Sequence, residues 1–592
     1  MRERWLALVD KTLKGADFDK RLVTRTADGE ALQPLYPPAE AANPAVRLRR
    51  AREPGRPWDV RVRTRTPDPA QASRELLADL EGGAASVLVA IDPAGEAGVA
   101  VASANDLRRA LKGVLLDLAP VGLDAGVLGP QAADWLGELA APIPDAPLAF
   151  HMDPISAFAL AGSSPGPIES HLVSAATVGA RLAERFPRAS LMLASGRVAH
   201  EAGGSEGQEL GVAAAAALAY ARALERAGLP LEQAFSRQVL GLSADADSFV
   251  VIAKMRAARA IWARLTAACG VTGTPAVIEA RSSARMLARV DPWVNMLRLT
   301  AAGFGAAAGG ADAVVLDAFT DAIGRPTAFA RRQARNTQLV LMEEAHLGRV
   351  DDPAGGSGVV EALTDSLARA GWAFLQAIEA QGGLLRALES GSVAAEVGRA
   401  RSARQAEYAR RKAGLIGVSE FPNLSEAPVA VDDADPGAFA RPSPPRVPPG
   451  PSPACTPLTP VRWAQPFEAL RERGLAAGAR AYLALLGPAA EHAARAGFAR
   501  NLLAVGGVRT TEGEAGAWDG APLAVLCGSD ERYAAEAAQA ARRLKGAGAT
   551  EVWLAGRPGE LEPALQEGGV DRFIYAGMDV TAALDAAVGA DL

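Results

Sequence analysis

The chain has 592 residues, of which 49% are hydrophobic and 22% are charged. That length is enough for two or three domains, and that composition excludes a chain disordered throughout. The formal net charge is −6, and no long basic run marks a nucleic-acid-binding surface. Cys269, Cys455 and Cys527 lie far apart without C-x-x-C spacing, which argues against a disulfide framework and a zinc knuckle.

The chain also carries no sign of a membrane partner. Its start, Met1-Arg-Glu-Arg-Trp5, has charges but no apolar segment, and no run of about 18 apolar residues follows anywhere. We therefore expect a soluble, cytoplasmic protein that binds neither membrane nor nucleic acid.

A helix is predicted over residues 4–13, followed by irregular chain to about residue 56. From there β-rich runs alternate with amphipathic helical patterns. The predicted strands are 59–63, 86–91, 114–118, 148–151, 190–194, 276–280 and 313–316, and the predicted helices include 70–80, 175–186 and 207–227. This alternation predicts a parallel sheet, and seven or eight repeats favour an α/β fold of the closed (β/α)8, TIM-barrel type.

The remainder of the chain divides at a proline-rich stretch. After Ser357 the pattern is almost wholly helical through Lys412, and 11 of the 40 prolines then fall in residues 428–460, which predicts an extended linker. Beyond it, strands are predicted at 481–486, 523–527, 551–555 and 572–576. A helix at 530–545 would be capped by Ser529 or Asp530 and ended by Gly546. This pattern predicts a small doubly wound α/β domain.

The predicted domains are therefore an N-terminal extension for subunit contact (1–55), the barrel (56–360), a helical appendage (361–427), the linker (428–460) and the C-terminal α/β domain (461–592).

Few residues point to a reaction. No pair among the five histidines has metal-ligand spacing, and neither H-E-x-x-H nor G-x-S-x-G occurs. His151 and Asp153 follow a predicted strand, where a barrel carries catalytic groups, although a hydrogen-bonded structural histidine is the alternative. His200 follows another strand and begins a glycine-rich turn, so a catalytic role is open there.

Motifs along the whole chain are shared with one known family. They are Lys14-Gly-Ala-Asp-Phe-Asp, Gln33-Pro-Leu-Tyr36, Gly55-Arg-Pro-Trp58, Asp291-Pro-Trp-Val-Asn295, Arg335-Asn-Thr-Gln338, Asp352-Pro-Ala-Gly-Gly-Ser357, Gly417-Val-Ser-Glu-Phe-Pro-Asn423 and Phe573-Ile-Tyr-Ala-Gly577. Through them the chain resembles the methylmalonyl-CoA mutases. The resemblance implies a barrel for an acyl-CoA and a C-terminal flavodoxin-like domain of the cobalamin-binding type.

In detail the chain resembles the small, beta subunit of the heterodimeric mutases, because positions used by catalytic chains differ. Catalytic chains read I-R-Q-Y-A-G after the tryptophan, with the tyrosine beside the substrate; here Arg63 stands there, expected as a solvated guanidinium. They also read G-Y-H-M-Q-E-A-G, whose histidine donates to the thioester carbonyl. His200 lies two residues too late for that role, and only a small deletion would restore it. A substrate-contacting glutamine is replaced by Val290.

The family's cobalamin motif, D-x-H-x-x-G, is also degraded. The matching segment is Ala490-Glu-His-Ala-Ala-Arg495, which keeps His492 at the ligand position but replaces the aspartate and the glycine. Loss of such an outer partner costs about 10–100-fold in metal affinity. Arg557 and Pro558 occupy a loop expected to cradle the cofactor's nucleotide. We therefore expect no catalytic, cofactor or metal residue on this chain.

The resemblance thus implies a non-catalytic subunit paired with a homologous large (alpha) subunit. That partner would hold adenosylcobalamin and the acyl-CoA and would interconvert methylmalonyl-CoA and succinyl-CoA. Two alternatives stay open: a catalytically competent acyl-CoA mutase with a shifted His200, and an acyl-CoA or corrinoid binding protein.

Overall fold

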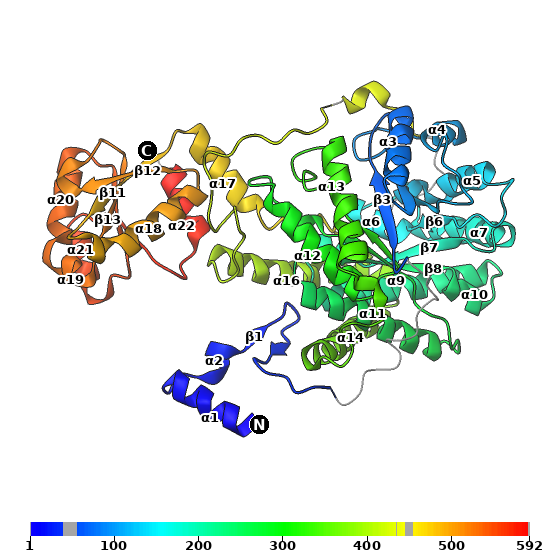
Figure 1. The fold of residues 1–592 in the computed structure, drawn as a ribbon, viewed down its shortest axis with the longest axis horizontal. Coiled ribbons are helices and arrows are strands. Elements are labelled where there is room, and N and C mark those ends of the chain that lie inside the picture. Colours follow the sequence, from blue (N-terminus) through cyan, green and yellow to red (C-terminus); the bar gives the residue numbers. More distant parts are fainter. Residues whose placement is uncertain (1, 40–55, 434, 444–453, 590–592) are drawn as a thin grey trace. The chain divides into compact units, whose positions relative to one another are not determined.

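The computed structural model describes residues 2–39, 56–433, 435–443 and 454–589 (Figure 1). The predicted extension (1–55) and linker (428–460) therefore lie partly outside the described residues. The chain forms two compact units. The barrel unit comprises Met1–Arg285, Met296–Arg401 and Val431–Val461, and the C-terminal unit comprises Met286–Asn295, Ser402–Ala430 and Arg462–Leu592.

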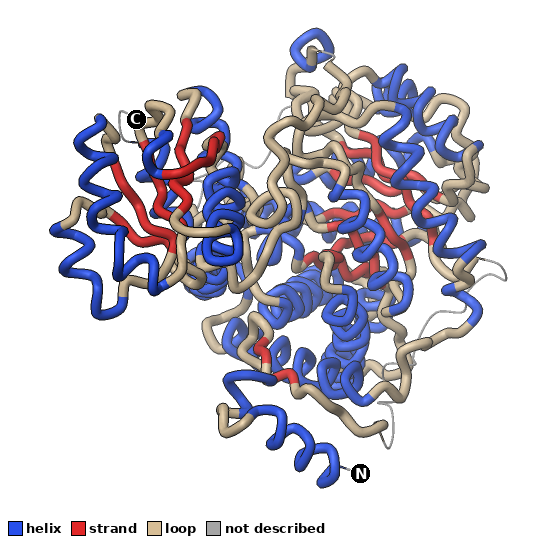
Figure 2. The backbone as a smooth tube through the Cα atoms, turned by 60° about the vertical axis from the view of Figure 1, so that its left-hand side comes forward, coloured by secondary structure: helices blue, strands red, loops and turns tan. Residues whose placement is uncertain are grey.

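The barrel unit contains a closed barrel of eight parallel strands in the order β10-β3-β4-β5-β6-β7-β8-β9, which confirms the predicted barrel (Figure 2). The strands are β3 (Asp59–Thr64), β4 (Ser86–Ala90), β5 (Val121–Asp124), β6 (Ala149–Met152), β7 (Ser190–Ser195), β8 (Gln238–Ala244), β9 (Ile278–Ser282) and β10 (Ala313–Val315). Because every strand runs in the same direction, their carboxyl ends meet at one mouth of the barrel.

Two strands of the barrel differ from the prediction. The strand predicted at 114–118 is wrong: these residues form turns, and Leu115 and Leu118 are exposed. The chain instead pairs β5 with β4, placing Val121 opposite Val87. Strand β8, which was not predicted, contains Gly241, and a glycine weakens the β-strand signal of a sequence.

Helices cover the outside of the barrel. They are α3 (Pro69–Glu81), α4 (Ala104–Ala110), α5 (Gly129–Leu139), α6 (Pro154–Ala161), α7 (Ile168–Arg185), α8 (Arg197–Glu201), α9 (Glu206–Arg226), α10 (Leu231–Ser236), α11 (Ser248–Ala268), α12 (Val294–Ala308) and α13 (Ala328–Leu339). The predicted helical stretch follows as α14 (Gly358–Glu379), α15 (Leu384–Glu389) and α16 (Ser392–Ala409). Helix α14 packs on α9 and α11 through Gly371, where a Cβ atom would lie 2.8 Å from Leu210 and from Ile261. Only glycine allows so close an approach.

The C-terminal unit contains a five-stranded parallel sheet in the order β12-β11-β13-β14-β15. Its strands are β11 (Arg480–Leu485), β12 (Arg509–Glu514), β13 (Leu523–Cys527), β14 (Glu551–Ala555) and β15 (Arg572–Ile574), and its helices are α17 (Gln465–Ala476), α18 (Ala489–Val505), α19 (Asp530–Arg532), α20 (Ala538–Ala547), α21 (Glu562–Glu567) and α22 (Val580–Gly589). Edge strand β12, which is polar, was not predicted. Ser529 caps the helical stretch that begins at α19, as predicted, but α20 runs past Gly546 and ends at Gly548, whose φ is +115°.

An N-terminal arm, residues 2–39, contains α1 (Arg2–Leu13), α2 (Phe18–Leu22) and a short antiparallel hairpin of β1 (Thr24–Arg25) and β2 (Ala31–Leu32). No residue of this arm is buried. Across the described ranges, no helix combines the length and the apolar character needed to cross a membrane.

Candidate functional site

The barrel interior is the first candidate site, and charged side chains fill it. Arg61 on β3 donates to Glu279 on β9 at 2.5 Å, to Asp59 at 2.8 Å and to Ser86 at 2.8 Å. These groups come from three different strands, since β3 lies between β10 and β4 and β9 adjoins β10. Arg61 therefore spans β10 and reaches a carboxylate on a strand with which β3 does not pair.

A second charged layer lies nearer the carboxyl ends of the strands. Arg63 contacts Asp124 at 2.9 Å and Asp317 at 3.8 Å, and Arg281 contacts the same two carboxylates at 3.2 and 3.1 Å. Burial, with Arg281 close by, lowers the pKa of Arg63 to about 9. Although burial opposes it, the two arginines hold the pKa of Asp124 and of Asp317 well below the ordinary range. The layer therefore consists of fully charged, mutually neutralising groups.

This geometry corrects one expectation from the sequence. Arg63 is not a solvated guanidinium: its side chain is 12% exposed and ion-paired inside the barrel. Its inward direction follows from the alternation of β3, which directs Asp59, Arg61 and Arg63 to one side and buried Val60 to the other.

His151 lies at the carboxyl end of β6, as predicted, but it is not the hydrogen-bonded structural histidine of the alternative. Its ring is buried, its Nδ1 lies 3.9 Å from Glu279, and neither ring nitrogen has a hydrogen-bond partner among the described residues. Burial lowers its pKa, so the ring is neutral at pH 7. Asp153 instead caps α6 and accepts a hydrogen bond from Tyr220 at 2.5 Å, and burial raises its pKa to about 6. Its contacts are those of a structural group.

A cavity of about 40 Å³ lies beside the second layer, lined by Arg63, Asp317, Asp321 and Arg335 among others. A water molecule needs about 10–15 Å³ of such space, whereas pockets for drug-sized ligands hold about 300–1,000 Å³. The cavity therefore has room for a few water molecules and not for an acyl-CoA.

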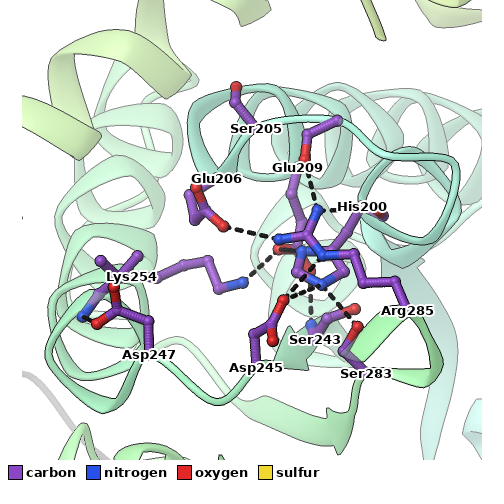
Figure 3. A network of polar contacts seen from close by, with 12 residues as sticks. His200, Ser205, Glu206, Glu209, Ser243, Asp245, Asp247, Lys254, Ser283 and Arg285 are labelled. Atoms are coloured by element: carbon purple, nitrogen blue, oxygen red, sulfur yellow. Dashed lines mark hydrogen bonds and ion pairs between the residues drawn. The ribbon is translucent and has the colours of Figure 1, made fainter. Parts of the chain in front are cut away.

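His200 belongs to a separate buried network (Figure 3). It lies on α8, not in a turn, and is completely buried. Its Nδ1 is 3.0 Å from Glu209, and its Nε2 is 2.9 Å from the hydroxyl of Ser283. Glu209 also accepts from Lys254 at 2.5 Å and from the backbone N–H of Ser243 at 2.5 Å. Although burial opposes it, Lys254 and His200 lower the pKa of Glu209.

Arg285 completes this network at the end of the barrel unit. It pairs with Asp245 at 2.8 Å and Glu206 at 3.0 Å, and it donates to the carbonyls of His200 and Gly204 (Figure 3). Together these contacts tie α8, α9, α11 and the ends of β8 and β9. Since His200 and Ser283 are both fully buried, their pairing supports the barrel and does not form an accessible catalytic pair.

Asp245→Asn tests how much the ion pairs of this network contribute to the free energy of unfolding. Although burial opposes it, Arg285 and His200 lower the pKa of Asp245 to about 2 from its ordinary 3.8. A lowered carboxyl pKa contributes stability that is complete above 3.8 and is lost as the pH falls through 2. We expect the variant to lose about 2 kcal/mol of unfolding free energy at pH 5–7, with the difference vanishing near pH 2. Urea unfolding between pH 2 and 7 measures it.

The matched control for that experiment is Asp585→Asn. Asp585 pairs with Arg473 at 2.8 Å on the surface, where both side chains are more than half exposed. Such pairs contribute about 0–1 kcal/mol. Equal losses in the two variants, or a loss at Asp245 that persists at pH 2, would contradict the prediction.

Val290 lies in the C-terminal unit, half-buried in the loop before α12. Its neighbour Asp291 has a φ of +45°, and a Cβ atom at Gly417 would lie 2.7 Å from the Asp291 Cβ. The structure therefore gives this segment a role in chain packing, and Val290 itself offers no polar group.

The carboxyl edge of the C-terminal sheet is the second candidate site, and it contains His492. This residue lies in the first turn of α18, and its buried Nδ1 has no hydrogen-bond partner among the described residues. Neighbouring Glu491 does not orient the ring, because it pairs with Arg532 at 2.6 Å.

Arg495 and Tyr533 occupy the space at the ends of β13 and β14. Arg495 donates to the Gly528 carbonyl at 2.7 Å and to Asp530 at 2.5 Å, and its guanidinium lies 4.7 Å from the centre of the Tyr533 ring. A Cβ atom on Gly556 would already lie 3.2 Å from Tyr533 and 3.3 Å from Arg495. Arg557 stacks on Tyr575 in a similar way, with its guanidinium 5.0 Å from the centre of the ring.

Several important residues were missed from the sequence. Arg61, Glu279, Arg281 and Asp124 carry the barrel layers, and Lys254 and Glu209 carry the second network. The signal available was the alternation of apolar and charged residues in Val60-Arg-Val-Arg63 and Ile278-Glu-Ala-Arg281, which indicates a strand with one charged face.

The chain matches the family model described as methylmalonyl-CoA mutase over residues 49–443. A methylmalonyl-CoA mutase small subunit of Streptomyces virginiae is 40% identical to it, covering 98% of this chain and 95% of the relative. A probable small subunit of Mycobacterium tuberculosis is 38% identical over 97% of this chain and 93% of the relative. The small subunit of Propionibacterium freudenreichii subsp. shermanii is 32% identical over 96% and 90%.

Proposed function

Because the chain belongs to the methylmalonyl-CoA mutase family, we propose that it is the small, non-catalytic subunit of a heterodimeric, adenosylcobalamin-dependent enzyme. In this proposal the homologous large subunit binds the cofactor and the acyl-CoA and interconverts methylmalonyl-CoA and succinyl-CoA. This chain supplies a structural partner in the cytoplasm.

The filled barrel is the observation that carries the proposal. A substrate that enters a barrel along its axis needs small side chains there. In this chain Arg61 and Glu279 pair inside the barrel, and Arg63 and Arg281 share two carboxylates nearer the carboxyl ends of the strands. Separating such buried pairs to admit a ligand would leave uncompensated charges, at a cost of about 3–5 kcal/mol for each broken pair.

The C-terminal unit supports the same proposal. Numbered along the chain, its strand order is 2-1-3-4-5, the order of flavodoxin-like domains, which bind ligands at the carboxyl edge of the sheet. The residues at that edge do not fit a histidine-ligated corrin. The Nδ1 of His492 lacks the carboxylate that would orient it, and Arg495 and Tyr533 fill the space at the ends of β13 and β14. We infer a degenerate cobalamin-type domain from residue 461 onward.

The N-terminal arm supports the assignment of residues 1–55 to subunit contact. Helix α1 buries no residue, Leu8 is 65% exposed, and Trp5 packs only at the edge of Phe18, with ring centres 6.2 Å apart. An amphipathic helix usually gains its stability by burying its apolar face against another element. We propose that the large subunit supplies that element.

The alternative of a competent mutase with a shifted His200 is less well supported. His200 would have to reach a thioester carbonyl, but its ring is fully buried and its two ring nitrogens face Glu209 and Ser283. An acyl-CoA binding role meets the same filled barrel.

A visible-spectrum titration with adenosylcobalamin, made on the chain alone and on its complex with the large subunit, tests the proposal. With the chain alone we expect neither a change in the corrin bands nor mutase turnover. With the complex we expect both a spectral change and turnover. A saturable spectral change of the chain alone, abolished by His492→Ala, would contradict the proposal. Turnover by the chain alone, abolished by His200→Ala, would establish the competent mutase instead.

A further inference from the structure

The N-terminal arm touches the barrel through the tip of its hairpin. The turn between β1 and β2 is closed by a backbone hydrogen bond from Gly29 to Thr26 at 2.9 Å and carries Asp28 at its tip. A second contact lies further on, where the N–H of Ala39 donates to the Gly356 carbonyl at 3.3 Å. Between α1 and β2 every residue keeps part of its surface exposed, and Asp28 is half-buried against the barrel, so the hairpin depends on what Asp28 binds.

Asp28 binds the first turn of α9. Its carboxylate accepts from the Ser205 hydroxyl at 2.5 Å and from the backbone N–H of Gly207 at 3.1 Å. Ser205 is the N-cap of α9, and its oxygen also accepts from Gln208, so one hydroxyl serves both the helix and the hairpin. A Cβ atom at position 207 would lie 2.5 Å from the Asp28 carboxylate, so only glycine allows this approach.

The charges around Asp28 are mainly negative. Glu206 faces it from α9, and Glu30 faces it from its own hairpin. Arg285 pairs with Glu206 at 3.0 Å, and Arg25 of the hairpin donates to the Gly29 carbonyl. From α14 the neighbouring residue is Ala370, which is uncharged.

We propose that Asp28 is a proton-dependent latch, which holds the N-terminal hairpin on the first turn of α9 more tightly when its carboxyl is protonated. The latch does not rest on the function proposed above, because every contact in it lies within the barrel unit.

The direction of the pH effect follows from the docked environment. Burial, and then Glu206, raise the pKa of Asp28 to about 6, against an ordinary value of 3.8 for the free hairpin. Between pH 3.8 and pH 6, docking of the hairpin is therefore accompanied by protonation of the Asp28 carboxyl. The docking equilibrium is most favourable below pH 3.8, weakens as the pH rises, and becomes constant above pH 6. Between pH 5 and pH 7 the docking constant should fall about tenfold.

Hydrogen exchange of the full chain at pH 5 and pH 7 tests the latch. The observables are the exchange rates of the hairpin amides and of the Gly207 amide, each divided by its intrinsic rate at the same pH. We expect protection of the natural chain to fall about tenfold from pH 5 to pH 7. Asp28→Asn keeps the acceptor oxygen without the titrating proton, so its protection should be the same at both pH values.

Two further variants make the result decisive. Asp28→Ala removes the acceptor and should abolish the protection of Gly207 at both pH values. Asp19→Asn removes an exposed carboxylate of the same arm and should behave like the natural chain. A pH dependence that survives in Asp28→Asn, or a natural chain whose protection does not change with pH, would overturn the proposal.

Discussion

Lys254→Met is expected to lower the free energy of unfolding of the barrel unit by about 3–5 kcal/mol. Lys254 and Glu209 are both completely unexposed and lie 2.5 Å apart. Removing the ammonium leaves the Glu209 carboxylate buried, with only His200 and one backbone N–H to compensate it. The loss comes from this stranded charge, since methionine preserves most of the apolar contacts of the lysine stem.

The same substitution on the surface is the matched control. Lys545 pairs with Asp571 at 2.7 Å, a comparable distance, but both side chains are about one-third exposed. Lys545→Met should cost no more than about 1 kcal/mol, and less in high salt. Hydrogen exchange of peptides from β8 and from β13 reports the two units separately. Losses of similar size at the two positions would show that burial is not the deciding factor.

Glu279→Gln should have a comparable effect inside the barrel, lowering the free energy of unfolding by about 3 kcal/mol. Glutamine occupies nearly the same space, so no cavity forms. Arg61, whose side chain is 9% exposed, is left with Asp59 as its one carboxylate partner, and its 2.5 Å ion pair with Glu279 is replaced by a hydrogen bond to an uncharged amide oxygen. Urea unfolding at pH 7, read from the β9 peptides by hydrogen exchange, measures the loss.

The double variant Arg61→Met/Glu279→Leu shows whether the pair or the packing is responsible. Replacing both partners of a buried pair by apolar residues is often neutral or stabilising, because neither charge then has to be desolvated. Asp59 keeps its hydrogen bond from Ser86 at 2.6 Å in this variant. We expect the double variant to be more stable than Glu279→Gln. A double variant that is less stable than the single one would contradict a charge-pair origin of the effect.

The Glu279→Gln prediction bears on the proposed function, because Glu279 lies inside the barrel. If stability resides in charge pairs inside the barrel, the interior is the core of a structural subunit and not a passage for substrate. A barrel that tolerated Glu279→Gln without loss would have interior groups that can move apart, and the acyl-CoA binding alternative would gain support.

The sequence determined the architecture of the barrel because most of its strands can be recognised from a short run of neighbouring residues. Runs such as β4 and β7 are apolar and bounded by helical patterns, and a parallel sheet buried on both faces requires this kind of strand. Strands β5, β8 and β12 were missed because they lack that signal. Strand β5 contains Gly122, β8 contains Gly241, and β12 is a polar edge strand of Arg, Thr and Glu. Their pairing is set by neighbouring strands, which local sequence does not contain.

In the candidate site, too, the sequence determined some features and the tertiary structure decided others. The motifs of the sequence identified the family and the altered positions, Arg63, Val290 and Arg495, because each can be read from residue type at a fixed spacing. What surrounds those positions was decided by the tertiary structure. Arg63 was expected in solvent and lies between Asp124 and Asp317, which are 61 and 254 positions away along the chain. Electrostatic partners so distant in sequence meet only when the barrel closes, so the charge of a residue is local information but its neutralisation is not.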